Sequence, residues 1–392
     1  MDIAQRYVHL CLRVDRHVED FVDAYVGPTT WRRSVASEDP VDPAHLRDEA
    51  NILADALDAA DLEPDRRRWL RGQLSAIACI TGRLAGEEFA WAEEVERCLG
   101  VRPTRTGTEA IGAVHRRLDE ALPGSGDLRD RYNAWDVRNA VPRQRLVPAL
   151  ERLNDVLRPR AHELAAMPSE ESVAYEVVSG VPWIAYNRYE GHHRSRIEVN
   201  ADLPVSIVLL VAIAAHESYP GHHTERSAKE ARLTRGLGRM ETGVAVASTP
   251  ESLISEGLAQ LALETALGPS PYEVVADALR DLGLRFDPRE AQAIHDAELD
   301  LYATVTNAAF MLHEDGLPQS EVASYMQTWG LESEERSSRT VRFIADPSAR
   351  AYVPAYPEGR RLCGAFAARA PGNFSRLLTE QLTTADLLAR AR

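Results

Sequence analysis

The chain has 392 residues, of which 44% are hydrophobic, so it is long enough to bury a large core. Its formal net charge is −15, and Lys229 is its single lysine. An acidic chain without basic blocks argues against a nucleic acid or an anionic membrane as partner. The four cysteines lack metal-type spacing, and the N-terminal residues do not resemble a signal peptide. We therefore expect a cytoplasmic protein with reduced cysteines.

Helical periodicity recurs between residues 3 and 166, where pairs of proline and glycine interrupt it. None of these predicted helices carries a recognisable motif. We expect residues 1–168 to form an N-terminal helical lobe and residues 169–392 to form the lobe that carries the chemistry. The two lobes can equally belong to one continuous fold.

Three segments after this region alternate polar with apolar residues and contain many β-branched and aromatic side chains. They are residues 173–178, 183–189 and 195–199. This pattern predicts a small antiparallel sheet. Its exposed edge would suit an extended peptide, although simple structural packing is the ordinary interpretation. Asn200 follows the last segment and is a candidate to present its amide to a substrate.

An almost wholly apolar run follows at residues 205–215, and it predicts a helix buried on all sides. Eleven residues are too few to span a bilayer. The run leads directly into residues 216–223, which read His-Glu-Ser-Tyr-Pro-Gly-His-His. Three histidines and a glutamate so close to a dry interior favour a metal site over a helix that happens to end at Pro-Gly.

The first ligands are predicted at His216 and His222. On an unbroken helix, residues six apart differ by about 9 Å in rise and about 240° in rotation, too much for two ligands of one zinc ion. Pro220 and Gly221 would break the helix and bring His222 to the metal. His223 would then be a hydrogen-bonding neighbour. If the break inserts three residues instead of two, His223 is the ligand and His222 is the neighbour.

A third ligand is needed because a catalytic zinc usually takes three protein ligands and keeps one position for water. The best candidate is Glu256, 34 residues after His222, within an amphipathic stretch at residues 250–267. Thr249 and Pro250 begin this stretch as a helix N-cap and first helical residue. The neighbouring Gly257 fits close packing of two helices. A solvent-facing role for Glu256 is equally compatible with its spacing.

The segments HESYPGHHTE and SEGLAQL are similar to the paired signatures H-E-x-x-P-G-H-H and E-G-W-A of a bacterial family called domain of unknown function 885. The likeness extends from about residue 183 to the C-terminus. That family's fold resembles the Taq-type zinc carboxypeptidases. The resemblance implies a mainly α, gluzincin-like metallopeptidase fold, with Zn²⁺ bound by His216, His222 and Glu256 and with Glu217 as general base.

A further likeness near the C-terminus concerns the family segment that ends in Y-x-x-G. Tyr356 fits the Y-x-x-G spacing, and Tyr352 fits the distance from Pro347 better. In helical gluzincins a tyrosine near the zinc donates a hydrogen bond to the developing oxyanion, and we rank Tyr356 first for this role. Both would otherwise be ordinary loop tyrosines.

The chain also departs from the family pattern. Leu258 replaces a tryptophan, Glu225 replaces a glutamine, and only His313 remains of the motif D-x-G-x-H. These changes spare the metal ligands and affect the expected substrate pocket. The candidate substrate-binding residues are His223, Tyr352, His313, Asn200 and Arg350. Arg350, together with Arg342 and Arg360, would clamp a substrate carboxylate.

The predicted function is a zinc-dependent hydrolase that acts on a peptide or small amide in the manner of a carboxypeptidase. One alternative is a biosynthetic amide hydrolase or lyase with a specific small metabolite as substrate. Another is a non-catalytic helical binding protein with a structural zinc, in which His223 or His313 would fill the fourth position. The oligomeric state stays open.

Overall fold

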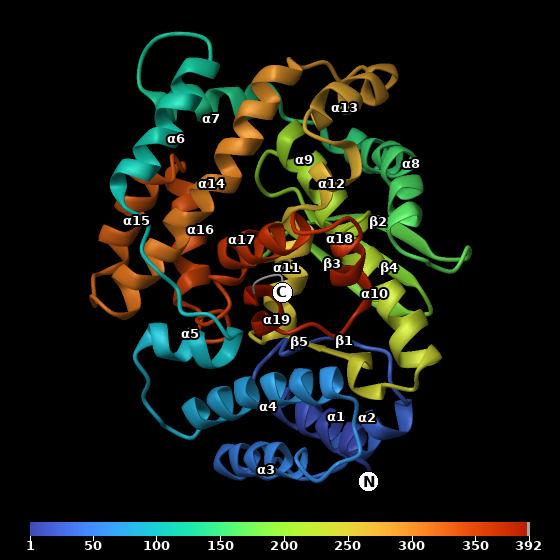
Figure 1. Cartoon of the computed structure of the whole chain (residues 1–392). Helices are drawn as coiled ribbons and strands as arrows, with labels where there is room; N and C mark the ends of the chain where they lie inside the picture. The colour runs from blue at the N-terminus through green and yellow to red at the C-terminus, as the bar shows by residue number, and fades with distance from the viewer. Residues whose placement is uncertain (390–392) are drawn as a thin grey trace.

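The computed structural model describes residues 1–389 and shows a mainly helical protein with small sheets, which confirms the predicted fold class (Figure 1). The N-terminal region is helical, as predicted, apart from one short strand. Its helices are α1 (Ile3–Val14), α2 (Thr29–Ala36), α3 (Pro43–Ala56), α4 (Pro64–Leu84), α5 (Trp91–Leu99), α6 (Thr108–Ala121), α7 (Leu128–Arg138) and α8 (Leu146–Leu164).

Helices also make up most of the chain after the sheet. They are α9 (Ile207–Ile213), α10 (His222–Lys229), α11 (Pro250–Gln260), α12 (Ala262–Leu267), α13 (Pro271–Leu279), α14 (Pro288–His313), α15 (Gln319–Trp329), α16 (Glu334–Ala345), α17 (Ala355–Ala367), α18 (Asn373–Thr379) and α19 (Thr384–Leu388).

The small sheet directly precedes the predicted metal helix and consists of β2 (Ser172–Val178), β3 (Ala185–Gly191) and β4 (Arg194–Asn200). It is mixed, not antiparallel as predicted: β4 lies in the centre, antiparallel to β3 and parallel to β2. His192 and His193 form the tight turn between β3 and β4, both with left-handed φ angles. The connection from β2 to β3 must therefore pass over the end of β4.

Asn200 secures this connection. Its Nδ2 donates to the carbonyl oxygens of Val181 and Trp183 at 3.0 and 2.9 Å. The backbone nitrogen of Asn200 also donates to the carbonyl of Ile184. The alternating pattern in the sequence predicts which side chains share a face, but it does not specify which strands pair.

A second, two-stranded sheet was not predicted. β1 (Val22–Tyr25) pairs antiparallel with β5 (Val244–Val246), although more than two hundred residues separate the strands. Neither strand is long enough to show a clear alternation. The pairing brings the N-terminal part of the chain beside β3 and the segment that follows α10.

Two clusters of buried apolar side chains form the core. One joins α1, α3, α4 and α5 to α11 and α17, and the other joins α6, α7 and α8 to α9, α13 and α14. Each cluster combines residues from either side of position 168. The four cysteines are buried and unpaired. Within residues 1–389, no helix has both the length and the apolar character needed to cross a membrane.

Candidate metal centre

The predicted break in the metal helix is present. α9 begins at the N-cap Ser206 and continues as a π-helical turn over Ala214–Ser218, which carries His216 and Glu217. The chain then turns, and α10 starts at His222. A Cβ at Gly221 would lie 1.9 Å from the carbonyl oxygen of His216, so a larger residue would push the turn away from the π-helical segment. Glycine is therefore required where the chain folds back.

Helix α11 brings Glu256 to the same place. Its N-terminus is held by a capping box between Thr249 and Ser252, with Pro250 in the first turn, as the sequence predicts. The close packing predicted at Gly257 is also present. A Cβ at this position would lie 2.3 Å from the carbonyl oxygen of Gly359, so α11 and α17 are in backbone contact beside Glu256.

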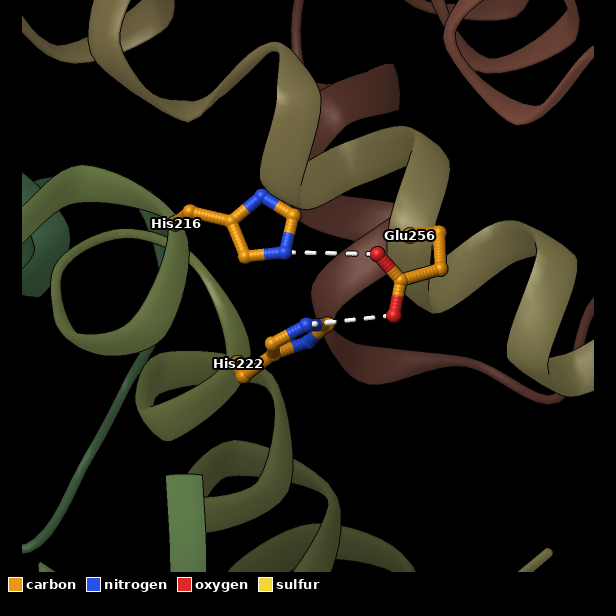
Figure 2. A group of neighbouring side chains, drawn as sticks. All are labelled: His216, His222 and Glu256. Atoms are coloured by element: carbon orange, nitrogen blue, oxygen red, sulfur yellow. Dashed lines mark ion pairs between the residues drawn. The ribbon is translucent and has the colours of Figure 1, made fainter. Parts of the chain in front are cut away.

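The side chains of His216, His222 and Glu256 converge (Figure 2). Nε2 of His216 lies 3.3 Å from Oε2 of Glu256, and Nε2 of His222 lies 3.5 Å from Oε1. One ligand atom from each residue lies within 4.8 Å of the other two. Two imidazole nitrogens and a carboxylate oxygen are a ligand set that zinc prefers.

The surroundings of the Glu256 carboxylate show whether these residues fit a cation. Oε2 of Glu256 is buried and accepts no hydrogen bond among the described residues, because its ion-pair neighbour, Nε2 of His216, is not aligned for one. A buried carboxylate oxygen without a donor is costly, and a cation between it and the two histidines would satisfy it. The three residues therefore fit a divalent metal ion. No fourth histidine, cysteine or carboxylate in residues 1–389 joins this group.

The electrostatics of the centre follow from burial and from the short distances between opposite charges. Burial lowers the pKa of His222, but Glu256 and Glu225 outweigh this effect and raise it to about 10. Burial opposes ionisation of Glu256, yet His222 and His216 hold its pKa well below the ordinary value. The carboxylate of Glu256 thus stays charged and attracts a cation.

Glu217 lies beside the three residues and also borders the cavity. Burial raises the pKa of its carboxyl group, while His216 and His222 oppose the rise. The backbone carbonyl of Glu217 accepts a hydrogen bond from Nδ2 of Asn187 at 2.6 Å, which ties the π-helical turn to β3. The side chain therefore remains available for chemistry in the cavity.

A buried polar chain orients His222. Nδ1 of His222 lies 3.1 Å from Oγ of Ser255, and Ser255 donates to Glu225. Since the serine proton goes to Glu225, Nδ1 of His222 is the donor, and Nε2 is the ring nitrogen that faces Glu256. Lys229 then joins Glu225 to Glu251 with distances of 2.7 and 2.6 Å. The single lysine of the chain offsets part of the negative charge of the two carboxylates behind His222.

His223 points away from His216, His222 and Glu256. Its Nε2 lies 2.8 Å from Oε2 of Glu171, and its Nδ1 lies 2.8 Å from Oγ of Ser195. Glu171 also receives hydrogen bonds from Tyr219 and Arg158. His223 thus anchors the start of α10 to the sheet, and the geometry selects His222 as the histidine that faces Glu256.

The two candidate tyrosines lie side by side at the centre. The hydroxyl of Tyr352 donates to Oε1 of Glu256, so Tyr352 contacts the predicted ligand. Tyr356 packs edge-on against Tyr352, with ring centroids 5.6 Å apart, and stacks on Tyr302. Both Tyr352 and Tyr356 line the cavity. The hydroxyl of Tyr356 neighbours that of Tyr352 and makes no hydrogen bond to a carboxylate among the described residues.

Four of the five predicted substrate-binding residues are engaged elsewhere, and His223, bound to Glu171 and Ser195 and absent from the cavity wall, is the first of them. The amide of Asn200 holds the connection between β2 and β3. His313 bonds to the carbonyl of Ile344 and stacks on Trp91, and Arg350 pairs with Glu94. None of Asn200, His313 and Arg350 is among the residues that line the cavity.

A cavity of about 910 Å³ opens above the centre. Its wall includes His216, Glu217, His222 and Glu256, and it also includes residues that the sequence did not single out: Asp23, Tyr186, Arg226, Trp183 and Phe343. Asp23 lies in β1, whose partner is β5. No local motif marks Asp23, so only knowledge of that long-range pairing would have identified it.

Comparison with known proteins adds evidence on the fold. No protein-family profile matches the chain, and no curated protein matches its sequence. A "putative lipoprotein" from Colwellia psychrerythraea is similar in structure, with a TM-score of 0.55, 15% identity and 86% of this chain covered. A "putative lipoprotein of unknown function" from Shewanella oneidensis gives a TM-score of 0.53, with 10% identity and 91% of this chain covered.

This chain spans 65% of the length of the Colwellia protein and 75% of the Shewanella protein. At such low identity the two likenesses concern the fold alone. An M32 carboxypeptidase from Deinococcus radiodurans has a TM-score of 0.37 and 13% identity, with 96% of this chain and 86% of that chain covered. A score of this size carries no argument about function.

Proposed function

We propose that the protein is a zinc-dependent hydrolase of peptide or amide bonds with a gluzincin-like centre. The observation that carries the proposal is the convergence of His216, His222 and Glu256 at the wall of a large cavity, where Oε2 of Glu256 is buried and accepts no hydrogen bond among the described residues. The resemblance of residues 216–223 to the domain of unknown function 885 family supports it, and membership in that family is part of the proposal.

His216, His222 and Glu256 would hold the metal, and zinc suits this ligand set. A bound zinc ion would supply a Lewis acid and lower the pKa of water to about 7. A low-dielectric site strengthens such effects, and Glu256 and His222 are both buried.

Glu217 is the proposed general base. Its carboxylate would take one proton from the attacking water and later give it to the nitrogen of the leaving group. The water oxygen forms a bond to the carbonyl carbon, the C–N bond breaks, and an acid and an amine result. The raised pKa of Glu217 suits the first of these transfers, because a carboxylate with a higher pKa is a stronger base and takes the proton of water more readily. Tyr356 would donate to the developing oxyanion.

A structural zinc would fill its fourth position with a protein side chain. The two histidines that would do so are engaged: His223 binds Glu171 and Ser195, and His313 binds the carbonyl of Ile344. Within residues 1–389, only three ligand groups gather. This arrangement favours a catalytic centre over a purely structural one.

Metal analysis of the purified protein tests the proposal. We expect about one zinc ion per chain, together with hydrolysis of a peptide library that a chelator abolishes and zinc restores. Glu217→Gln should retain zinc and lose turnover. Full activity in this variant would rule out Glu217 as the general base. If small acylated amino acids are cleaved and longer peptides are not, the enzyme is instead a hydrolase of a specific metabolite.

A further inference from the structure

We propose that Arg226 binds a free carboxylate of the substrate, so that the enzyme cleaves the amide bond of a C-terminal amino acid. The inference rests on the proposed hydrolase function and adds to it the class of substrate. The products would be a shortened acid and a free amino acid, with no co-reactant other than water.

Arg226 stands on the helix that carries the second ligand. It follows His222 by four residues on α10, so both side chains lie on one face of the helix with Cβ atoms about 5–6 Å apart. One residue of an extended peptide spans about 3.5 Å. A carboxylate one residue beyond the scissile bond would therefore come within reach of Arg226 when the scissile carbonyl lies at the metal ligands.

The guanidinium is held in place and keeps donors free. Nη2 of Arg226 pairs with Oδ2 of Asp23, and the hydroxyl of Tyr186 donates to Oδ1 of Asp23. Nε of Arg226 is buried without a partner, and Nη1 has no acceptor among residues 1–389. A guanidinium has five donors, and a nearly buried one normally uses most of them. This group, 16% exposed, lines the cavity and has Asp23 as its one acceptor among residues 1–389.

The guanidinium of Arg226 remains a cation in the cavity wall. Burial works against the cation, but Asp23 and Glu225 raise the pKa of Arg226, so the guanidinium stays protonated. Glu225 is itself paired with Lys229 and does not contact Arg226 within ion-pair distance. A carboxylate entering the cavity therefore meets an oriented cation whose one protein partner is Asp23. Asp23 reduces the attraction and at the same time fixes the direction of the fork.

The other arginines considered from the sequence are less suited. Arg350 is paired with Glu94, Arg360 lies 3.6 Å from Asp300, and neither lines the cavity. Arg342 lines the cavity, but its side chain is exposed. A solvated guanidinium gains less from a carboxylate than a desolvated one, because water screens the charges. Arg226 is therefore better placed than these three arginines to distinguish a carboxylate from an amide, because it is largely buried and lines the cavity.

The test compares two substrates that differ in one group. The zinc-loaded full chain is given an N-acylated dipeptide with a free C-terminal carboxylate and the same compound as a C-terminal amide. We expect kcat/KM to be at least about 100-fold higher for the carboxylate, the order of one charge-assisted contact. In Arg226→Gln this ratio should fall towards one, mainly because KM for the carboxylate substrate rises. Arg226→Lys keeps the charge beside Asp23 and should give an intermediate ratio.

Arg342→Gln is the matched control, because it removes an exposed arginine from the same cavity; its substrate ratio should stay at the wild-type value. Zinc content and the circular dichroism spectrum should be unchanged in the Arg226 variants. A wild-type ratio near one, an unchanged ratio in Arg226→Gln, or loss of the ratio in Arg342→Gln would each overturn the inference.

Measuring how tightly the two compounds bind distinguishes a failure of this inference from a failure of the proposed hydrolase function. If the zinc-loaded wild type hydrolyses neither substrate, the hydrolase proposal fails, and calorimetry with the same two compounds then decides the role of Arg226. Carboxylate binding at least ten times tighter than amide binding, lost in Arg226→Gln, would support it. Equal binding of both compounds would refute it.

Discussion

Gly257 and Gly359 lie against each other where α11 crosses α17. A Cβ on Gly257 would lie 2.3 Å from the carbonyl oxygen of Gly359, and a Cβ on Gly359 would lie 2.9 Å from the Cα of Gly257. Glu256 precedes the first glycine, and Tyr356 lies one turn before the second. The crossing therefore sets the distance between a proposed zinc ligand and the proposed oxyanion donor.

Gly257→Ala should force the two helices apart. We expect a loss of about 1–3 kcal/mol in the free energy of unfolding, the usual cost of overpacking a core. Zinc affinity and turnover should fall together, because Glu256 moves with α11. Denaturant unfolding, zinc titration and activity measurements check this expectation.

Gly364→Ala is the control for this change. It lies on the same helix α17, but a Cβ there would meet Leu261 only at 3.7 Å, an ordinary contact. Since alanine is the better helix former, this variant should be neutral or more stable by up to about 1 kcal/mol. If Gly257→Ala behaved like Gly364→Ala, the close crossing would have no energetic importance.

Ser255 connects the proposed ligand His222 to the buried pair of Glu225 and Lys229. Ser255→Ala removes the acceptor for Nδ1 of His222, so the imidazole is less firmly oriented. We expect zinc affinity to fall by about 10-fold to 100-fold, as for other residues that orient metal ligands. Competition with a chromophoric chelator would measure it. Ser324→Ala, at an exposed position of α15, should leave zinc affinity unchanged.

The sequence was most informative where the chemistry is local. His216, Glu217 and His222 fall within seven residues, and the Pro-Gly pair between them has a direct structural reason, so the helix break was predictable. Glu256 was identifiable because Thr249 and Pro250 mark the start of its helix.

Long-range pairing explains what the sequence did not reveal. Asp23 reaches the cavity only because β1 pairs with β5, and strands of three or four residues carry little pattern. The alternation in β2, β3 and β4 gave the faces of the strands and not their order, so the parallel pairing was missed. His313 and Arg350 bond to one another outside the cavity wall, and their sequence positions do not indicate this.

Glu332, outside the proposed centre, should make the stability of the protein depend on pH. Burial raises the pKa of Glu332 from 4.5 to about 7, although Thr340 donates to it. The folded state then binds this proton more tightly than the unfolded state. Its contribution to stability is complete below pH 4.5 and is lost as the pH rises through 7, by up to about 3 kcal/mol.

Glu332→Gln should therefore flatten the fall in unfolding free energy between pH 5.5 and 8, measured by urea denaturation. Part of the slope should remain, because burial and the charge of Asp136 raise the pKa of Glu298 to about 7 as well. An unchanged slope in Glu332→Gln would mean that Glu332 titrates near its ordinary value in the folded protein.

The two tyrosines beside Glu256 should have separable effects. Tyr352 donates to the carboxylate of Glu256, so Tyr352→Phe should weaken zinc binding by about 10-fold or more and lower activity mainly at limiting zinc. Tyr356→Phe should leave zinc affinity unchanged and lower kcat at saturating zinc by about 100-fold to 1000-fold, the usual loss for one oxyanion donor. Both variants retain the aromatic ring, so the packing on Tyr302 is preserved. If Tyr352→Phe lowered kcat at saturating zinc and Tyr356→Phe did not, the oxyanion role would belong to Tyr352.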